Sequence, residues 1–231
     1  MIAGHTYLIA GGGKNTKNGA PATQAQLVGP DGLAVDSHGN IVTGGQVIAE
    51  ATGTFFGQHM MAGHVYTVGG NTTAQVIDAH GNAVVTLDDR HVEIIAATSG
   101  TFYGRAMVAG HTYVVAGDGD QTSSGDGGPA VDAGMFPNSA AIDSSGNLLI
   151  GDGTVFGTLR VVAETSRTFY GQPMTAGDIY TIAGGGSGYG NGLLALDAKF
   201  DNNFSLAVGP GNVILVGESL DGVVRRLSQQ P

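Results

Sequence analysis

Short apolar runs bounded by glycine and asparagine recur along the whole chain. Each run of one kind is followed by Asp-x-x-Gly-Asn and then by a second and a third apolar run, as in Leu148–Ile150 and Leu159–Val162. Such runs with turn residues between them predict strands paired as hairpins. No stretch of about 12 residues keeps the i, i+3, i+4 rhythm of a helix. The copies of this motif lie at 36–40, 78–82 and 143–147, with a degraded copy, Gly-Pro-Gly-Asn, at 209–212.

A second phrase, Gly-Thr-Phe followed by Phe or Tyr and Gly, recurs at 53–57 and 100–104, and at 167–171 with Arg in the first place. After each copy come a methionine and a strand that begins Ala-Gly-His or Ala-Gly-Asp, at 62–68, 109–115 and 176–182. A fourth copy of that strand lies at 3–9. Each unit therefore predicts four strands, with the second phrase as a long connection before the outermost one.

Units of this size fit the blades of a propeller better than a sandwich, whose loops would not repeat. We therefore predict one all-β domain over residues 1–231, a four-bladed β-propeller closed by the N-terminal strand pairing with the C-terminal blade. The alternative is two chains that pair into an eight-bladed ring, so we expect a monomer, or a dimer in that case. The predicted units span about 11–69, 70–116, 117–183, and 184–231 completed by 1–10.

Three fragments resemble bacterial NHL-repeat propellers: Gly125-Asp126-Gly127-Gly128-Pro129-Ala130, Ala34-Val35-Asp36 with Gly39-Asn40, and the stretch from Thr168 to Gly184. The similarity covers almost the whole chain. It implies a propeller fold and, because NHL repeats are commonly binding modules, a binding or sensor role. NHL propellers usually have about six blades, whereas this chain supplies four units.

Composition narrows the partners. Glycine supplies 41 of 231 residues, as many tight turns require, and the formal net charge is −10. Such a surface repels phosphate backbones and anionic lipid, so we expect neither nucleic acid nor a membrane as partner. There is no cysteine, so thiolate chemistry is excluded. Without a signal segment or a long apolar stretch at the start, we expect a cytoplasmic protein.

Two sets of residues suggest metal sites, and we expect neither to bind a metal. His5, His64 and His111 occupy equivalent positions in different units, so a ring would keep them apart. The acidic run at 118–126 has Ser123 and Pro129 where a calcium loop needs Gly and Glu. The aspartates of the Asp-x-x-Gly-Asn motif are expected to bind their own turns. We therefore expect no metal and no cofactor.

The units differ mainly in the connections before each first strand. Those connections are long at 11–32, 117–139 and 184–205, but short at 69–73. In a propeller they share one face with the loops between second and third strands, and long loops on a rigid scaffold commonly bind ligands. We expect a walled pocket there, mostly apolar with a few polar groups. Asp88 and Asp152 belong to the same loops.

The expected hydrogen-bonding, catalytic residues of this pocket are Gln75, Asn138, Thr73 and Ser205. The expected substrate-binding residues are Asp31, Phe136, Ser139, Phe204, Tyr189, His91 and Glu218.

Three functions compete at this point. The first is a cofactor-independent cyclase that folds an apolar, polyketide-like substrate in natural-product biosynthesis by shape and hydrogen bonding. The second, ranked slightly lower, is a non-catalytic NHL-type binding or sensor module. The third, well behind, is a metal-assisted lyase that would recruit His91, Asp88 and Glu218. All three place a small apolar molecule or a partner at the pocket, and fold alone does not separate them.

Overall fold

The structure is a computed structural model that describes residues 2–30, 32–70, 73–87, 90–154, 157–202 and 204–228, with the backbone alone for 73–75. The described chain is all-β: it contains many small antiparallel sheets, none of them closed, and no α-helix. This architecture is compatible with a propeller.

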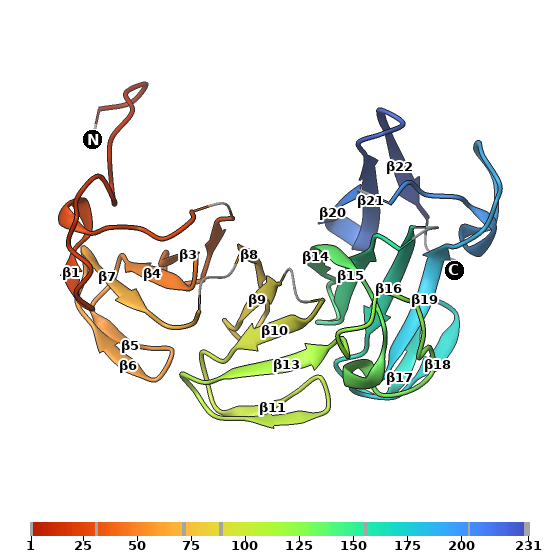
Figure 1. Cartoon of the computed structure of the whole chain (residues 1–231), viewed down its shortest axis with the longest axis horizontal. Helices are drawn as coiled ribbons and strands as arrows, with labels where there is room; N and C mark the ends of the chain where they lie inside the picture. The colour runs from red at the N-terminus through yellow and green to blue at the C-terminus, as the bar shows by residue number, and fades with distance from the viewer. Residues whose placement is uncertain are drawn as a thin grey trace.

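Four larger sheets follow one another along the chain (Figure 1). The first has the order β1 (Ala20–Pro21), β7 (His64–Thr67), β4 (Gln46–Ala49), β3 (Ile41–Thr43), β2 (Ala34–Val35). The second has the order β13 (Thr112–Ala116), β10 (Val92–Ile95), β9 (Ala83–Thr86), β8 (Thr73–Ile77). The third has the order β14 (Pro137–Ile142), β15 (Leu148–Asp152), β16 (Thr158–Val162), β19 (Ile179–Gly184). The fourth has three strands, β20 (Phe204–Gly209), β21 (Val213–Glu218) and β22 (Val223–Leu227).

The Gly-Thr-Phe phrase, which we expected to be a plain connection, forms an additional two-stranded hairpin in each of the first three units. At its tip, Phe56, Tyr103 and Tyr170 have φ of 47°, 49° and 50°, and a positive-φ glycine follows each. Two positive-φ residues in succession make the tight turn that suits a twisted hairpin. The hairpins are β5 (Gly53–Phe55) with β6 (Gln58–Met60), β11 (Gly100–Phe102) with β12 (Arg105–Met107), and β17 (Arg167–Phe169) with β18 (Gln172–Met174).

Alternating residues of each central strand face opposite neighbours, which stacks the sheets. Val84 packs toward the third sheet and Val85 toward the first. In the third sheet, Leu148 packs toward the second sheet and Leu149 toward the fourth. Each pair of adjacent sheets thus has its own apolar core, because successive strand side chains point to opposite faces. The inner strands β2, β8, β14 and β20 lie side by side in that order.

The turns after the inner strands confirm the expected role of the motif aspartates. Asp143 Oδ1 accepts hydrogen bonds from the backbone N–H groups of Ser145 (2.8 Å) and Asn147 (2.9 Å). Its Oδ2 accepts from the side-chain amide of Asn147 at 2.8 Å. Asp36 and Asp78 make the same bonds in their own turns. Four short 3₁₀ helices complete the elements: η1 (Ala22–Gln24), η2 (Ala130–Asp132), η3 (Ala195–Asp197) and η4 (Pro210–Asn212).

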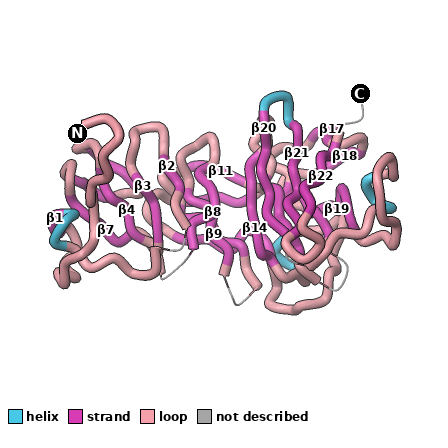
Figure 2. The backbone as a smooth tube through the Cα atoms, turned by 90° about the horizontal axis from the view of Figure 1, so that it is seen from above, coloured by secondary structure: helices cyan, strands magenta, loops and turns pink. Residues whose placement is uncertain are grey.

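The expected ring closure is not confirmed. Residues 3–9 form no strand, and β22 is an edge of the fourth sheet among the described residues. The four sheets form an open arc, and two perpendicular views place the two ends of the chain at opposite ends of it (Figures 1 and 2). The first and fourth sheets lie apart in this arc, so the strand pairing that would close the ring is not made among the described residues.

The motif aspartates predict a graded effect on stability. Asp143 also accepts a hydrogen bond from the Tyr170 hydroxyl at 2.8 Å, whereas no such tyrosine bond to Asp36 is recorded among the described residues. Asp143→Ala removes four bonds at a buried site, so we expect a loss of about 2–4 kcal/mol. Asp36→Ala, in a more exposed copy of the same turn, should cost less. Urea unfolding followed by circular dichroism measures both, and equal losses would contradict this account.

Candidate functional site

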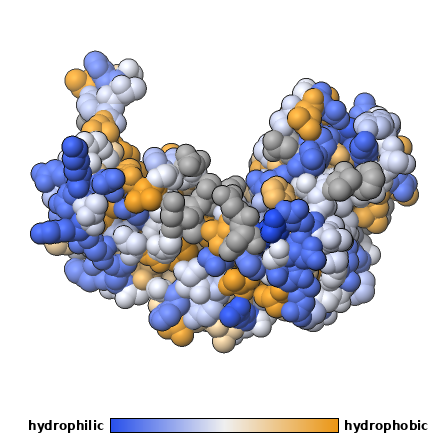
Figure 3. Space-filling model, in the orientation of Figure 1, coloured by the Kyte–Doolittle hydropathy of each residue, from blue (hydrophilic) through white to orange (hydrophobic). Residues whose placement is uncertain are grey.

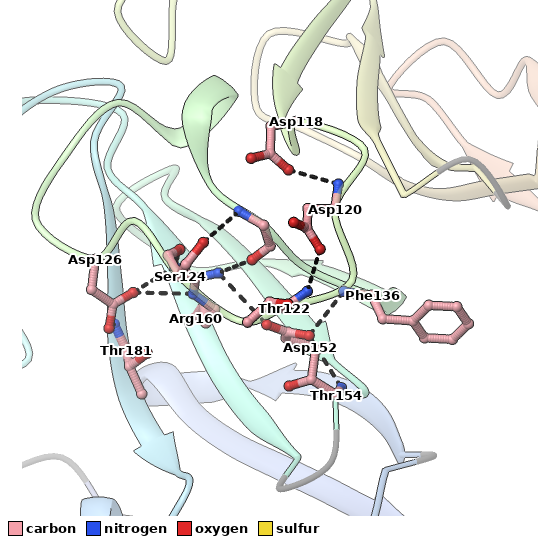
Figure 4. A network of polar contacts seen from close by, with 11 residues as sticks. Asp118, Asp120, Thr122, Ser124, Asp126, Phe136, Asp152, Thr154, Arg160 and Thr181 are labelled. Carbon is pink, nitrogen blue, oxygen red and sulfur yellow. Dashed lines mark hydrogen bonds and ion pairs between the residues drawn. The ribbon is translucent and has the colours of Figure 1, made fainter.

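The long loop at 117–139 is fixed by one buried arginine of the third sheet (Figure 4). Arg160 on β16 is fully buried, and its guanidinium donates to Asp126 Oδ1 from Nε (3.1 Å) and Nη2 (2.6 Å). It also donates to the carbonyl oxygens of Ser124 (2.6 Å) and Gly134 (2.9 Å). A planar guanidinium with several fixed donors suits this use, because it satisfies three points of a loop from one strand position.

Asp152, at the end of β15, continues this network toward the surface. Its Oδ2 lies 3.6 Å from Arg160 Nη1, and its Oδ1 accepts the backbone N–H groups of Phe136 (2.9 Å) and Thr154 (3.2 Å). The Phe136 ring projects away from the network and is 42% exposed (Figure 4). The buried charges therefore fix the backbone of a residue whose aromatic side chain faces outward.

Two glycines, Gly153 and Gly157, bring the backbone of the fourth unit's loop directly onto the third sheet, and a third, Gly151, lies close under side chains. A Cβ at Gly153 would lie 2.4 Å from the Asn202 carbonyl oxygen, and one at Gly157 would lie 2.0 Å from that of Asp201. A Cβ at Gly151 would lie 2.3 Å from Ser139 Oγ. Only glycine allows such close approach, so this part of the sequence positions residues 200–204.

Four expected site residues lie around Gly151 and Gly153 at this junction of the third and fourth sheets: Phe136, Asn138, Ser139 and Phe204. Glu218 pairs in register with Phe204, and Ser205 pairs with Gly217. The Asn138 amide donates to the Asn202 carbonyl oxygen at 2.9 Å and accepts from Ser139 Oγ at 3.4 Å. Phe204 is buried and lies 5.8 Å, centroid to centroid, from Phe200. Most of these groups therefore bind the protein itself, whereas Ser205 is exposed on β20.

Glu218 is buried at the end of β21, in the position that Asp152 has in β15. It pairs with the Arg225 guanidinium, and its Oε2 accepts the Asp201 N–H at 2.9 Å. Asp201 Oδ2 in turn accepts the Leu220 N–H at 2.8 Å. The acid–arginine pair thus repeats between the two sheets and holds a loop in each case.

An open hollow of about 280 Å³ lies beside this junction. Lys199 Nζ lies 4.9 Å from the centroid of the Tyr189 ring, a cation–π distance. Side-chain hydrogen bonding with Tyr189 raises the pKa of Lys199, with a smaller contribution from Asp221. The lining residues are Tyr189, Lys199, Phe200, Asp201, Asn202, Leu220 and Asp221.

Among the other expected residues, the structure describes the side chain of His91 away from this junction. His91 lies near Gly119, at the loop between the second and third sheets. Thr73 and Gln75 belong to β8, but their side chains lie outside the described part, as do Asp31 and Asp88 as whole residues. Within the described ranges, no three His, Asp or Glu side chains lie close enough together to hold a metal ion.

Sequence reasoning missed Arg160, Lys199, Asn202 and Leu220. Arg160 carries a recognisable signal, since it interrupts an otherwise apolar strand, Leu159–Val162. Asn202 and Lys199 carry no such signal, because their roles come from the loop's approach to the glycines of the third sheet.

Comparison with known proteins gives a fold but no activity. No protein-family model and no curated protein matches this chain. A structural-genomics protein of unknown function from Bacteroides thetaiotaomicron has a similar structure, with a TM-score of 0.56 and 14% sequence identity. The match covers 84% of this chain and 46% of that protein, so this chain matches less than half of its length. Among the described residues, no helix is both long and apolar enough to cross a membrane.

The contacts of Arg160 predict that its replacement causes a large loss of stability, localised to the loop that it holds. Arg160→Met leaves Asp152 buried without its cation and frees two carbonyl groups, so we expect about 3–5 kcal/mol of destabilisation. The loop at 117–136 should become the first site of proteolysis. Chemical unfolding and limited proteolysis with mass spectrometry measure the two effects.

The matched control is Asp126→Asn. The half-exposed Asp126 carboxylate accepts from Arg160 at Oδ1 and from the Thr181 N–H at Oδ2, and an asparagine keeps only one of these two acceptors. We expect a loss of about 1–2 kcal/mol, smaller than for Arg160→Met, because Arg160 still donates to the loop carbonyl groups and pairs with Asp152. A control that is as damaging as Arg160→Met would refute the assigned role of Arg160.

Proposed function

We propose that this chain is a binding module with four NHL-type propeller units, and that it holds a small ligand at the hollow beside Tyr189. The observation that carries the proposal is the combination of an exposed aromatic ring and an exposed aliphatic side chain with one charged ammonium around a single opening. Tyr189 and Leu220 are both largely exposed, and Lys199 lies over the Tyr189 ring. Binding sites commonly combine apolar surface with a few fixed polar groups.

The chemistry of the hollow indicates the ligand class. Tyr189 and Leu220 offer apolar contact area, and Lys199 offers a donor for an anionic or carbonyl oxygen. Asp201 is already engaged by the Leu220 N–H, which leaves Asp221 as the acidic group at the rim. A small amphipathic molecule, with an aromatic or aliphatic part and one acceptor group, matches these side chains. The volume of about 280 Å³ fits a fragment-sized ligand.

We rank binding above catalysis because the polar groups of the junction are already bonded to other protein groups. A catalyst that works by hydrogen bonding needs donors aimed at the reacting atoms of the substrate. The Asn138 amide is bound on both sides by protein groups, and Glu218 is paired with Arg225. These contacts favour a rigid platform that presents Phe136 and Tyr189.

Cofactor-independent cyclisation of an apolar substrate is the second proposal. Ser205 supports it, because it is exposed on β20 opposite Gly217, which carries no side chain. If compounds that bind are also converted, Ser205→Ala should lower kcat and leave affinity unchanged. Liquid chromatography–mass spectrometry of the compounds after incubation with the protein measures conversion.

The binding proposal predicts where ligands act. In a fragment screen by NMR with ¹⁵N-labelled protein, amphipathic fragments should shift the amides of Tyr189, Asn202 and Leu220. Tyr189→Ala should weaken their binding about tenfold, the value of one aromatic contact. Val108→Ala, which truncates an exposed apolar residue before the second sheet's outer strand, is the control. Shifts that map elsewhere, or equal effects of both variants, would reject this site.

A further inference from the structure

The N-terminal segment, residues 2–10, has the local geometry of an outer strand although it pairs with no strand among the described residues. Tyr7 Oη accepts the Ile2 N–H at 2.8 Å, as Tyr66 Oη accepts the Met61 N–H at 2.8 Å ahead of β7. The same bond precedes β13 and β19. Gly4 has φ of 79°, close to the 74° of Gly63 in the equivalent place. The segment is thus folded locally for a partner.

Its side chains are exposed where those of its counterparts are buried. Tyr7 is 45% exposed and Tyr66 is 8% exposed; Ile9 is 45% exposed and its equivalent in β19, Ile182, is 8% exposed. An outer strand that leaves these apolar side chains in water has not reached the place that its sequence fits.

An outer strand is held from both sides in the first and third sheets. β7 pairs with β4 on one side. On its other side, the Gly19 N–H donates to the Val65 carbonyl oxygen, and the Ala22 N–H donates to the Gly63 carbonyl oxygen just before β7, both at 2.8 Å. In the third sheet, the carbonyl oxygens of Ile179 and Gly177 accept the equivalent bonds from the N–H groups of Gly127 and Ala130, at 2.7 and 2.9 Å. A side chain adds a third bond, because Asp126 accepts the Thr181 N–H at 3.0 Å as Asn18 accepts that of Thr67.

The fourth sheet has the two elements that lie on either side of an outer strand: β22 on one side and residues 191–195 on the other. Gly192 and Ala195 stand where Gly127 and Ala130 stand in the third unit, and Asn191 stands where Asp126 does. Gly192 has φ of 79°, against 80° for Gly127, and η3 repeats η2. A hollow of about 540 Å³ lies between residues 190–195 and β22, and no strand fills it within the described chain. We call this hollow the strand slot.

Outer strands also contact the hairpin tip of the preceding unit, and the equivalent hairpin tip lies beside the strand slot. The hairpin tip of the second unit packs on the third unit's outer strand, since a Cβ at Gly104 would lie 2.8 Å from the Ala176 carbonyl oxygen. The equivalent tip, Tyr170–Gly171, lines a hollow of about 350 Å³ that shares Leu194 and Leu227 with the strand slot. The two hollows together follow the path of an outer strand and the turn before it.

The register of the third sheet transfers to the slot. There Arg160 pairs with Thr181, and Val162 pairs with Ile179. The positions correspond to Arg225 with Leu8 and to Leu227 with Thr6. Tyr7 and Ile9 then take the places of the partly buried Tyr180 and the buried Ile182, and the Leu8 side chain takes the more exposed place of Thr181. Asn191 would accept the Leu8 N–H.

We propose that the strand slot is filled by the N-terminal segment of a second copy of this chain, so that two arcs exchange strands and close one ring. The segment and the slot lie at opposite ends of the arc, and the outline between them is hollowed (Figures 1 and 3). Closure within one chain would have to bend three interfaces that are packed with buried side chains. A copy related by a twofold axis brings each segment to the other's slot with these interfaces unchanged.

The proposal concerns assembly and does not rest on the ligand site beside Tyr189.

A disulfide test separates the two ways of filling the slot. The chain has no cysteine, so Thr6→Cys and Leu227→Cys introduce the only thiols. Two singly substituted chains, mixed and oxidised, should form a covalent heterodimer of twice 23.2 kDa. Each variant oxidised alone is the control for random cross-linking. The doubly substituted chain should also give an intermolecular product on a denaturing gel.

Three results overturn the proposal. An internally cross-linked monomer would show that each chain fills its own slot, and no specific cross-link would show that the segment does not enter it. Light scattering of the unmodified protein must also give twice the monomer mass, and a monomer at all concentrations would refute the exchange.

A pair of matched variants tests the register. Ile9→Asp places a charge where the slot buries a side chain, and should weaken dimerisation about 100-fold or more. Leu8→Asp, its neighbour, points outward in the same register and should change dimerisation little. Both positions are exposed in the single arc, so neither substitution is expected to unfold it. Equal effects of both variants would contradict the proposed register.

Discussion

Sheet-on-sheet packing through alternating strand residues is the interaction on which the rest of this structure depends. Each central strand sends one set of side chains to the preceding sheet and the other set to the next, as Val84 and Val85 or Leu148 and Leu149 do. A sheet with two apolar faces is stable only between two neighbours, so the array extends until an end is covered in another way. In the first sheet, residues 10–27 cover one face with a small apolar cluster. The fourth sheet instead leaves β22 as an open edge.

Buried charges act as loop anchors within this apolar array. Arg160 with Asp126 and Asp152, and Arg225 with Glu218, are placed at equivalent strand positions of consecutive sheets. A buried ion pair is costly to desolvate, and here the cost is offset by hydrogen bonds to loop carbonyl groups. These contacts hold irregular loops against the sheets. The exposed rings of Phe136 and Tyr189 are presented from these loops.

The strand slot and the anchored loops derive from one repeated device. Residues 19–22, 127–130 and 192–195 have the same conformation, and in the first two units this stretch binds the outer strand of its own sheet. The third copy has the same backbone and no strand beside it in the described chain. Because residues 19–22 and 127–130 each bind an outer strand, we infer that residues 192–195 bind an outer strand as well. The N-terminal segment matches that partner in sequence and in local geometry.

The sequence by itself determined the all-β class, the strand order within each unit and the aspartate turns, because these depend on nearest neighbours along the chain. The alternation of apolar residues, the Gly-Asn turns and the bond from Asp143 to Asn147 are all local. The alignment of the repeats proposed a set of site residues, and whether they bind a ligand stays a prediction. Only the tertiary structure decided that the Asn138 amide is bound by protein groups, that Lys199 joins Tyr189, and that the arc is open. These features depend on the angle between sheets and on backbone approaches at Gly153 and Gly157, which no periodicity in the sequence encodes.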